Sequence, residues 1–124
     1  MSAAPAFASA DPALFNPQSG RLDASHIASD LQLPVSTIAV AIGKKAPNAR
    51  KHPDASSLQP ELRCLYRVWV GIVELHAGNK KSARIFLNAP NRLLENHAPV
   101  EFIASGNLMP LEALVEAMTT RQPA

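Results

Sequence analysis

Residues whose types could support catalysis or metal binding are few and scattered in this 124-residue sequence. The single cysteine, Cys64, has no second cysteine with which to form a disulfide, and His76 has no second ligand or catalytic partner at a suitable spacing. We find no glycine-rich phosphate loop and no Ser/His/Asp or Cys/His arrangement in a recognisable context. The aspartates fall in predicted caps and loops. We therefore expect a binding protein and not an enzyme, with no catalytic residue, no metal site and no cofactor.

The composition predicts an all-α protein of about one domain. Hydrophobic residues make up 47% of the chain and aromatic residues only 5%, which fits a core rich in alanine and leucine. The formal net charge of +2 is too small to indicate nucleic-acid binding by itself. No apolar run reaches the length of a membrane span, and a single cysteine suits a reducing compartment. We therefore expect a cytoplasmic protein that does not contact a membrane.

The chain divides into three predicted parts: a leader over 1–20, a helix-turn-helix-like part with a basic linker over 21–58, and a helical C-terminal part over 59–124. The leader is rich in Ala, Ser and Pro and lacks the basic residues that begin a signal peptide. We expect it to be flexible, although Leu14 and Phe15 could pack onto the body as a single turn.

Two short helices joined by a tight turn are predicted over 23–43, with Asp23 as the N-cap of the first. Aliphatic and small residues recur at helical spacing on their inner faces, namely Ile27, Ala28, Leu31, Ile38 and Ala41. The turn departs from the helix-turn-helix pattern, because Gln32 replaces the usual glycine and Pro34 the usual serine or threonine cap. The outward face of the second helix, predicted as Val35, Ser36, Ala39 and Val40, lacks side chains that read base edges.

A basic run interrupted by Pro47 and Pro53 follows the second helix. Such a run is either an arm that contacts phosphates or a solvated linker, and the two prolines favour the linker. The candidate DNA-binding residues are Ser36, Lys44, Lys45, Arg50 and Lys51.

The longest helix is predicted to start at Pro60 and to stop near 78–79, with an apolar stripe from Leu62 to His76. Val68 and Val70 make its other face less polar than a free surface, which suggests association with another chain. A last helix is predicted from Pro110, with its own stripe of Leu111, Leu114, Val115 and Met118.

Between these helices lies a segment with an unusual polar display. Ala83, Phe86 and Leu87 predict a short helix that ends near 88, since Pro90 pushes the residue before it out of the helical conformation. The 90–95 segment then places Arg92 and the Asn91 amide next to a proline, with a second amide just before it at Asn88, as recognition surfaces do. We call this segment the 90–95 loop.

The 62–118 segment resembles the toxin-binding domain of the Xre/MbcA/ParS antitoxins. The resemblance lies in a helix ending in an apolar pair, a Pro-Asn step with a Leu-rich stretch, a second short helix and a final amphipathic helix. This chain has Glu95-Asn96 where many members of the family carry a glycine pair. The resemblance implies that 59–124 is a toxin-binding domain and that the protein is a type II antitoxin.

Antitoxins of this family pair with RES-domain toxins, which consume NAD or transfer its ADP-ribose to a protein. The resemblance implies that the C-terminal region blocks the toxin's NAD pocket, with Arg121 as the candidate that reaches into it, in a hetero-oligomer with the toxin. The apolar excess on the longest helix also predicts self-association of the antitoxin. The implied toxin-binding residues are Pro90, Asn91, Arg92, Glu95, Leu114, Met118, Thr120 and Arg121.

Three alternatives remain open from the sequence. The last helix could only close its own domain, and Arg92 could only cap carbonyls or pair with Glu95. The rival function is a helix-turn-helix transcriptional regulator that binds operator DNA and represses its own operon.

Overall fold

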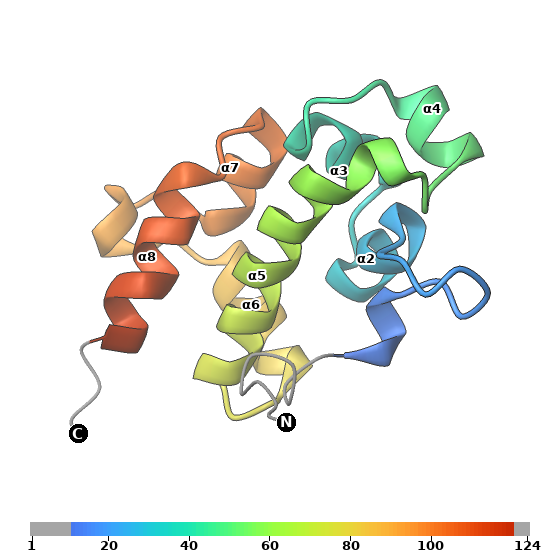
Figure 1. The fold of residues 1–124 in the computed structure, drawn as a ribbon. Helices are drawn as coiled ribbons and strands as arrows, with labels where there is room; N and C mark the ends of the chain where they lie inside the picture. The colour runs from blue at the N-terminus through green and yellow to red at the C-terminus, as the bar shows by residue number, and fades with distance from the viewer. Residues whose placement is uncertain (1–10, 121–124) are drawn as a thin grey trace.

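The computed structural model describes residues 11–120, which fold as an all-α protein without a β-strand (Figure 1). Seven α-helices and three short 3-10 helices make up this part of the chain. In order they are η1 (Pro12–Leu14), α2 (Ala24–Leu31), α3 (Val35–Ala41), α4 (Ala46–Lys51), η2 (Ser56–Leu58), α5 (Gln59–Leu75), α6 (Lys80–Asn88), η3 (Arg92–Leu94), α7 (Pro99–Ser105) and α8 (Met109–Thr120).

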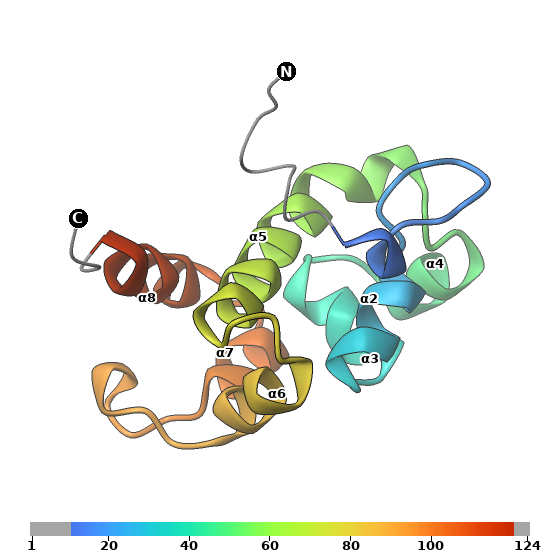
Figure 2. The same ribbon diagram turned by 90° about the horizontal axis from the view of Figure 1, so that it is seen from below.

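The long helix α5 runs through the middle of the molecule, with α2 and α4 on one side and α8 on the other, while α7 packs on α3 (Figures 1 and 2). Its inner face is buried, and Leu62, Leu65 and Ile72 have no exposed surface. One cluster of buried residues extends from Leu14 to Leu114 and includes α5. The expected division at 58/59 therefore crosses a single hydrophobic core.

A polar cluster on the side of α5 ties four elements together. The Asp30 carboxylate accepts hydrogen bonds from the Trp69 indole, at 2.7 Å, and from Lys80 Nζ, at 2.8 Å. Lys80 also pairs with Asp11 next to η1, and Arg84 Nε donates to the Asp30 carbonyl oxygen at 2.7 Å. Elements far apart in the sequence are thus joined by charge-assisted hydrogen bonds.

The residues from Asp11 to Gly20 do not form the flexible leader that we expected. Leu14 is fully buried, and Phe15 forms an isolated antiparallel bridge with Leu22, so this turn closes onto the core. The predicted single turn at 14–15 is confirmed, as η1. Residues 1–10 of the predicted leader lie outside the described residues.

The turn between α2 and α3 uses Gln32 in the left-handed conformation (φ 59°) that a glycine adopts more easily. Pro34 occupies the N-cap position of α3 without a side-chain hydrogen bond. Ala39, predicted on the outward face of α3, is buried instead, because α7 packs on α3. The approach is close at Gly106, where a Cβ would lie 2.9 Å from the Val40 carbonyl oxygen.

The basic segment after α3 contains the helix α4 and is not simply the solvated linker that we expected. Pro47 lies in the first turn of α4, where the missing N–H breaks no hydrogen bond, so it favours the helix. Ala49 is fully buried where α4 packs on α2 and α3. A single small apolar residue among charged ones gave too weak a pattern to predict this helix.

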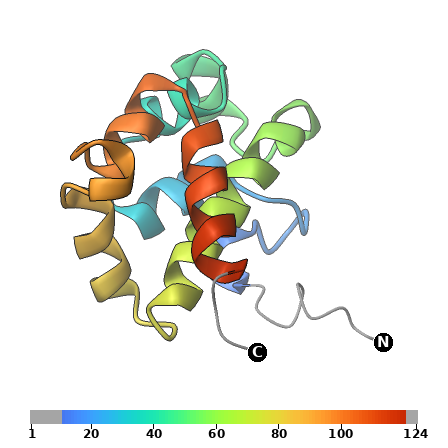
Figure 3. The ribbon, with the colours of Figure 1, turned by 90° about the vertical axis from the view of Figure 1, so that its left-hand side faces the viewer.

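The last helix, α8, lies along α5, as Figure 3 shows from the α8 side. Leu111 and Leu114 are buried in the core. A Cβ at Gly71 of α5 would lie 2.5 Å from Val115 Cγ1, so this glycine is what allows α8 to approach. Val68 is 2% exposed, so the apolar surface that suggested contact with another chain is largely buried within this one.

We expect Gly71→Ala to lower the free energy of unfolding by about 1 kcal/mol, because the clash with Val115 exceeds the usual gain of alanine in a helix. In a Val115→Ala background the same exchange should instead stabilise the protein, because the space is then free. Urea unfolding of the four proteins of this double-mutant cycle would measure both effects. Equal effects of Gly71→Ala in the two backgrounds would contradict the proposed close contact.

The predicted N-cap at Asp23 is confirmed and is linked to stability at low pH. Its carboxylate accepts hydrogen bonds from the backbone N–H groups of Ser25 and His26, from the Ser25 hydroxyl and from the Asn16 amide. Burial acts to raise the pKa of Asp23, but these hydrogen bonds outweigh it and hold the pKa below its usual value of 3.8.

A carboxylate with a lowered pKa stabilises the fold above its unfolded-state pKa, and this stabilisation is lost as the pH falls through the folded-state value. We therefore expect the free energy of unfolding to fall between about pH 5 and pH 2. Asp23→Asn, which keeps a capping oxygen but cannot ionise, should make that fall shallower. Urea unfolding at a series of pH values would measure this. If the free energy of unfolding fell as steeply with pH in Asp23→Asn as in the parent protein, the prediction would be wrong.

Within residues 11–120, no helix combines the length and the apolar character that crossing a bilayer would require.

Candidate functional site

The 90–95 loop closes on itself through backbone hydrogen bonds. Asn91 and His97 form an isolated antiparallel bridge, in which the Asn91 N–H donates to the His97 carbonyl oxygen at 3.1 Å. The Asn96 N–H donates to the Asn91 carbonyl oxygen at 2.8 Å. The Asn91 side chain accepts from the Leu93 N–H at 2.8 Å and so caps η3. The loop is therefore held in one conformation by its own bonds and by the cap.

Two consecutive non-glycine residues make the return turn of this loop in the left-handed conformation. Glu95 has φ 56° and Asn96 has φ 68°. Glutamate normally avoids this region, at a cost of about 1–2 kcal/mol, whereas asparagine tolerates it better. Leu94 offsets this strain, because its side chain is buried against the core.

Between the Asn91 cap and the buried Leu94, the side chains of Arg92 and Leu93 point to solvent. Leu93 is 62% exposed, an unusual position for a large apolar side chain. Arg92 is exposed, and among residues 11–120 its guanidinium has no hydrogen bond or ion pair, including none with Glu95. The described structure thus does not contain the Arg92–Glu95 pair that was the alternative interpretation of this arginine.

The far end of the loop is fixed to the first turn of α7. Glu101 accepts hydrogen bonds from the Ala98 N–H, at 2.9 Å, and from His97 Nδ1, at 3.1 Å. The bond from the Ala98 N–H, followed by that from His97, lowers the pKa of Glu101 below its usual value of 4.5. The loop and the helix that follows therefore form one continuous unit.

The C-terminal residues of the predicted toxin-binding set are only partly at the surface. Leu114 is buried against α5, so its assignment to a binding surface is corrected: it closes the domain. Met118 is half-buried, and Thr120 is exposed, with its hydroxyl donating to the Glu116 carbonyl oxygen at 2.9 Å. Arg121 lies outside the described residues. The end of α8 and the 90–95 loop lie on the same side of α5 (Figures 1 and 2).

The predicted DNA-binding residues lie in or between the neighbouring helices α3 and α4, and the basic ones form a surface around α4. Lys45, Arg50 and Lys51 are exposed on and beside α4, whereas Ser36 is half-buried in α3. Lys44 Nζ lies 4.0 Å from the Glu61 carboxylate, which offsets part of its charge. The surface around α4 is therefore positively charged, but the described part of α3 beside it exposes no side chain of the kind that reads base edges.

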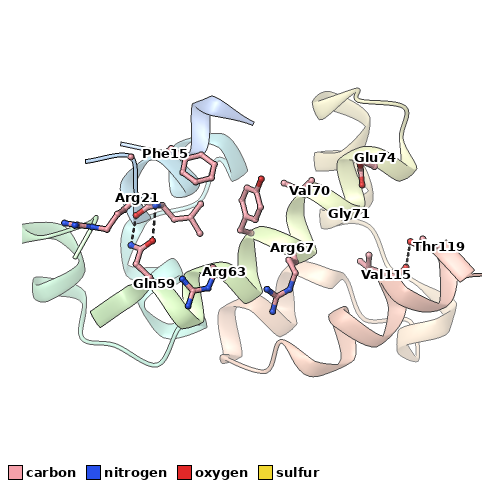
Figure 4. Close-up of a pocket in the computed structure, with 13 residues that line it drawn as sticks. Phe15, Arg21, Gln59, Arg63, Arg67, Val70, Gly71, Glu74, Val115 and Thr119 are labelled. Carbon is pink, nitrogen blue, oxygen red and sulfur yellow. Dashed lines mark hydrogen bonds between the residues drawn. The ribbon is translucent and has the colours of Figure 1, made fainter. Parts of the chain in front are cut away.

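A groove that we did not predict lies between the loop after η1, α5 and α8 (Figure 4). Its volume is about 780 Å³, within the range of ligand sites. One face of α5 forms its floor, with lining residues Arg63, Tyr66, Arg67, Val70, Gly71 and Glu74. These recur at helical spacing, but the sequence assigned them to two different faces, because Tyr66 reads as core and the charged residues as solvated surface.

In comparisons with known proteins, no protein-family model, no curated protein and no solved structure matches this chain. Within residues 11–120 there is also no group of three His, Cys, Asp or Glu side chains placed to hold a metal ion.

Proposed function

We propose that this protein is a type II antitoxin that neutralises a RES-domain toxin in the cytoplasm. In this proposal the 90–95 loop and the C-terminal region contact the toxin and block its NAD site. The toxin either consumes NAD or transfers ADP-ribose to a protein. The antitoxin itself has no catalytic role and needs no cofactor.

The observation that carries the proposal is a pre-formed loop that exposes a large apolar side chain beside a cation that has no ion pair within residues 11–120. Leu93 and Arg92 provide apolar area and a planar donor group, a combination frequent at the energetic centres of protein interfaces. Because the loop is already held in one conformation, binding would cost little ordering entropy.

The conformation of Glu95 and Asn96 adds support for the resemblance. The family often carries a glycine pair at this place, and both residues have the positive φ that glycine adopts without strain. A glycine pair and this Glu-Asn pair would thus serve the same turn. Glu95→Gly should relieve strain and leave inhibition intact, if the turn alone matters.

The C-terminal region would supply the block itself. We propose that Thr120 and Arg121 follow α8 into the toxin pocket, where a guanidinium could pair bidentately with acidic groups near the NAD ribose. Met118 would contribute apolar area, while Leu114 holds α8 against the core and so positions the segment. This separates an anchoring role from a binding role within one helix.

The direct test mixes the purified protein with a RES-domain toxin and follows NAD consumption. The full chain should inhibit, and a form ending at Ala117 should not, because it lacks Met118, Thr120 and Arg121. Equal inhibition by both forms would move the block to the 90–95 loop. Absence of inhibition by either form would refute the antitoxin proposal. Native mass measurement of the mixture would give the composition of the hetero-oligomer and any self-association.

The second candidate function is a helix-turn-helix regulator that represses its own operon. It is favoured by the left-handed Gln32 between α2 and α3, by the exposed Arg50 and Lys51 on α4 and by Lys45 just before it. It predicts duplex binding that weakens steeply with salt. Lys45→Ala, Arg50→Ala and Lys51→Ala should then each reduce the salt slope by about 1. A flat salt dependence would exclude this candidate.

A further inference from the structure

The groove between the loop after η1, α5 and α8 is elongated and has an apolar centre. Its floor extends along α5 from Arg63 to Glu74, which corresponds to about 17 Å of helix. Phe15 and Tyr66 meet edge to face at a ring separation of 5.6 Å on one side, and Val115 of α8 stands on the other. These side chains are half-buried, so each still exposes apolar surface that a ligand could cover.

The two ends of the groove carry opposite charge (Figure 4). Arg63 lies near the start of α5 and Arg67 one helical turn later, at its middle, whereas Glu74 lies near its end. Within residues 11–120 Arg63 and Glu74 have no ion pair, and Arg67 has only a weak contact with Cys64 Sγ at 3.6 Å. Two like charges at this spacing repel each other, so they favour an anionic neighbour. Arg21, at the same end, is already bonded to Asp54.

We infer that this groove binds an amphipathic helix of a partner protein, with acidic residues at the Arg63/Arg67 end and a basic residue at the Glu74 end. A floor made of one helical face and an apolar centre suit an apolar stripe, as in helix-in-groove recognition. The separated charges fix the direction in which the helix lies. The groove is separate from the 90–95 loop, because the loop after η1 and the 90–95 loop lie on opposite sides of α5 (Figure 2), whereas α8 forms one wall of the groove and also belongs to the proposed toxin contact.

The test uses three fluorescein-labelled helical peptides of about four turns that share one leucine stripe. The first has acidic residues in one half and lysines in the other, the second has acidic residues in both halves, and the third has lysines in both. Fluorescence anisotropy with the full chain should give the tightest binding for the first peptide. Equal affinities for all three, or no binding, would overturn the inference.

Charge reversal in the protein tests the direction of binding. Arg63→Glu with Arg67→Glu should weaken the first peptide about tenfold or more, because two attractive contacts become repulsive. Adding Glu74→Lys should restore the affinity, because the reversed groove accepts the same peptide turned end for end. A structural defect could not be rescued in this way.

The matched control is Lys81→Glu, an exposed charge change on α6 and outside the groove that should leave peptide binding unchanged. Unfolding curves check that each variant is folded. If the Arg63→Glu and Arg67→Glu protein bound all peptides as the parent does, the inference would be wrong. It would also be overturned if those changes abolished self-association, since the groove would then be filled by a second copy of the chain.

Discussion

Replacing Trp69 with alanine is expected to lower the free energy of unfolding by about 3–5 kcal/mol. Trp69 lies in the middle of α5, is 1% exposed, and is among the largest fully buried side chains. Its removal would leave a cavity in the core and would also remove the indole N–H that donates to Asp30 at 2.7 Å. For a domain of this size such a loss is a large part of the total stability.

Trp69→Phe separates these two contributions, because it keeps much of the volume but not the hydrogen bond. We expect it to cost about 1–3 kcal/mol. Since Trp69 is the only tryptophan, unfolding should be followed by circular dichroism and not by fluorescence. Val40→Ala, at a 48% exposed position, is the control and should cost about 0.5 kcal/mol or less. A cost for Trp69→Ala no larger than that of the control would contradict the described core.

Arg92→Ala and Leu93→Ala are each expected to weaken inhibition of the toxin about thirtyfold, if the 90–95 loop is the contact that we propose. Both side chains are exposed, so the free energy of unfolding should change by about 0.5 kcal/mol or less. Inhibition of NAD consumption, titrated with each variant, and urea unfolding would measure the two effects separately.

Lys81→Ala and Ile85→Ala provide matched controls, because they remove an exposed cation and an exposed apolar side chain from α6, outside the loop. They should leave inhibition as it is in the parent protein. Weaker inhibition accompanied by an equal loss of stability in Arg92→Ala would indicate a structural role for this arginine. Unchanged inhibition in both loop variants would remove the loop from the proposed interface.

Helix boundaries were largely predictable, because they depend on residues close in sequence. Asp23 caps α2, Pro60 lies in the first turn of α5, and the residue before Pro90 ends α6 at Asn88. The all-α class is confirmed for the same reason: the apolar spacing that determines it is local.

The contacts that join the helices could not be predicted in this way. Ala39, Ala49 and Gly71 are small residues with little pattern of their own, and each marks a place where another helix packs closely. The Gln59 side chain likewise pairs with both backbone groups of Leu22, a contact between distant residues that no local motif announces. Because such contacts join residues far apart in sequence, surfaces that we predicted to be exposed, such as the outward face of α3 at Ala39, are buried in the structure.

For the candidate site, the sequence indicated the polar display of the 90–95 loop but not which of its side chains are exposed and which residues of α8 are buried. The Pro-Asn step and Arg92 pointed to the 90–95 loop, whereas Leu93 was overlooked because a leucine reads as core. Leu114 was assigned to the surface because one apolar stripe had to be divided between the core and a partner. Only the packing of α8 on α5 places Leu114 in the core.

The continuous core and the Asp30 cluster have a consequence for how this protein can change during evolution. Asp30 comes from the first half of the chain, whereas Trp69, Lys80 and Arg84 come from the second, so neither half retains its bonding partners alone. The halves therefore cannot be exchanged between relatives as independent modules, and a cut at 58/59 should give two unfolded fragments. Any ligand that binds one half must also stabilise the other, so occupation at one end protects the whole of residues 11–120 from proteolysis.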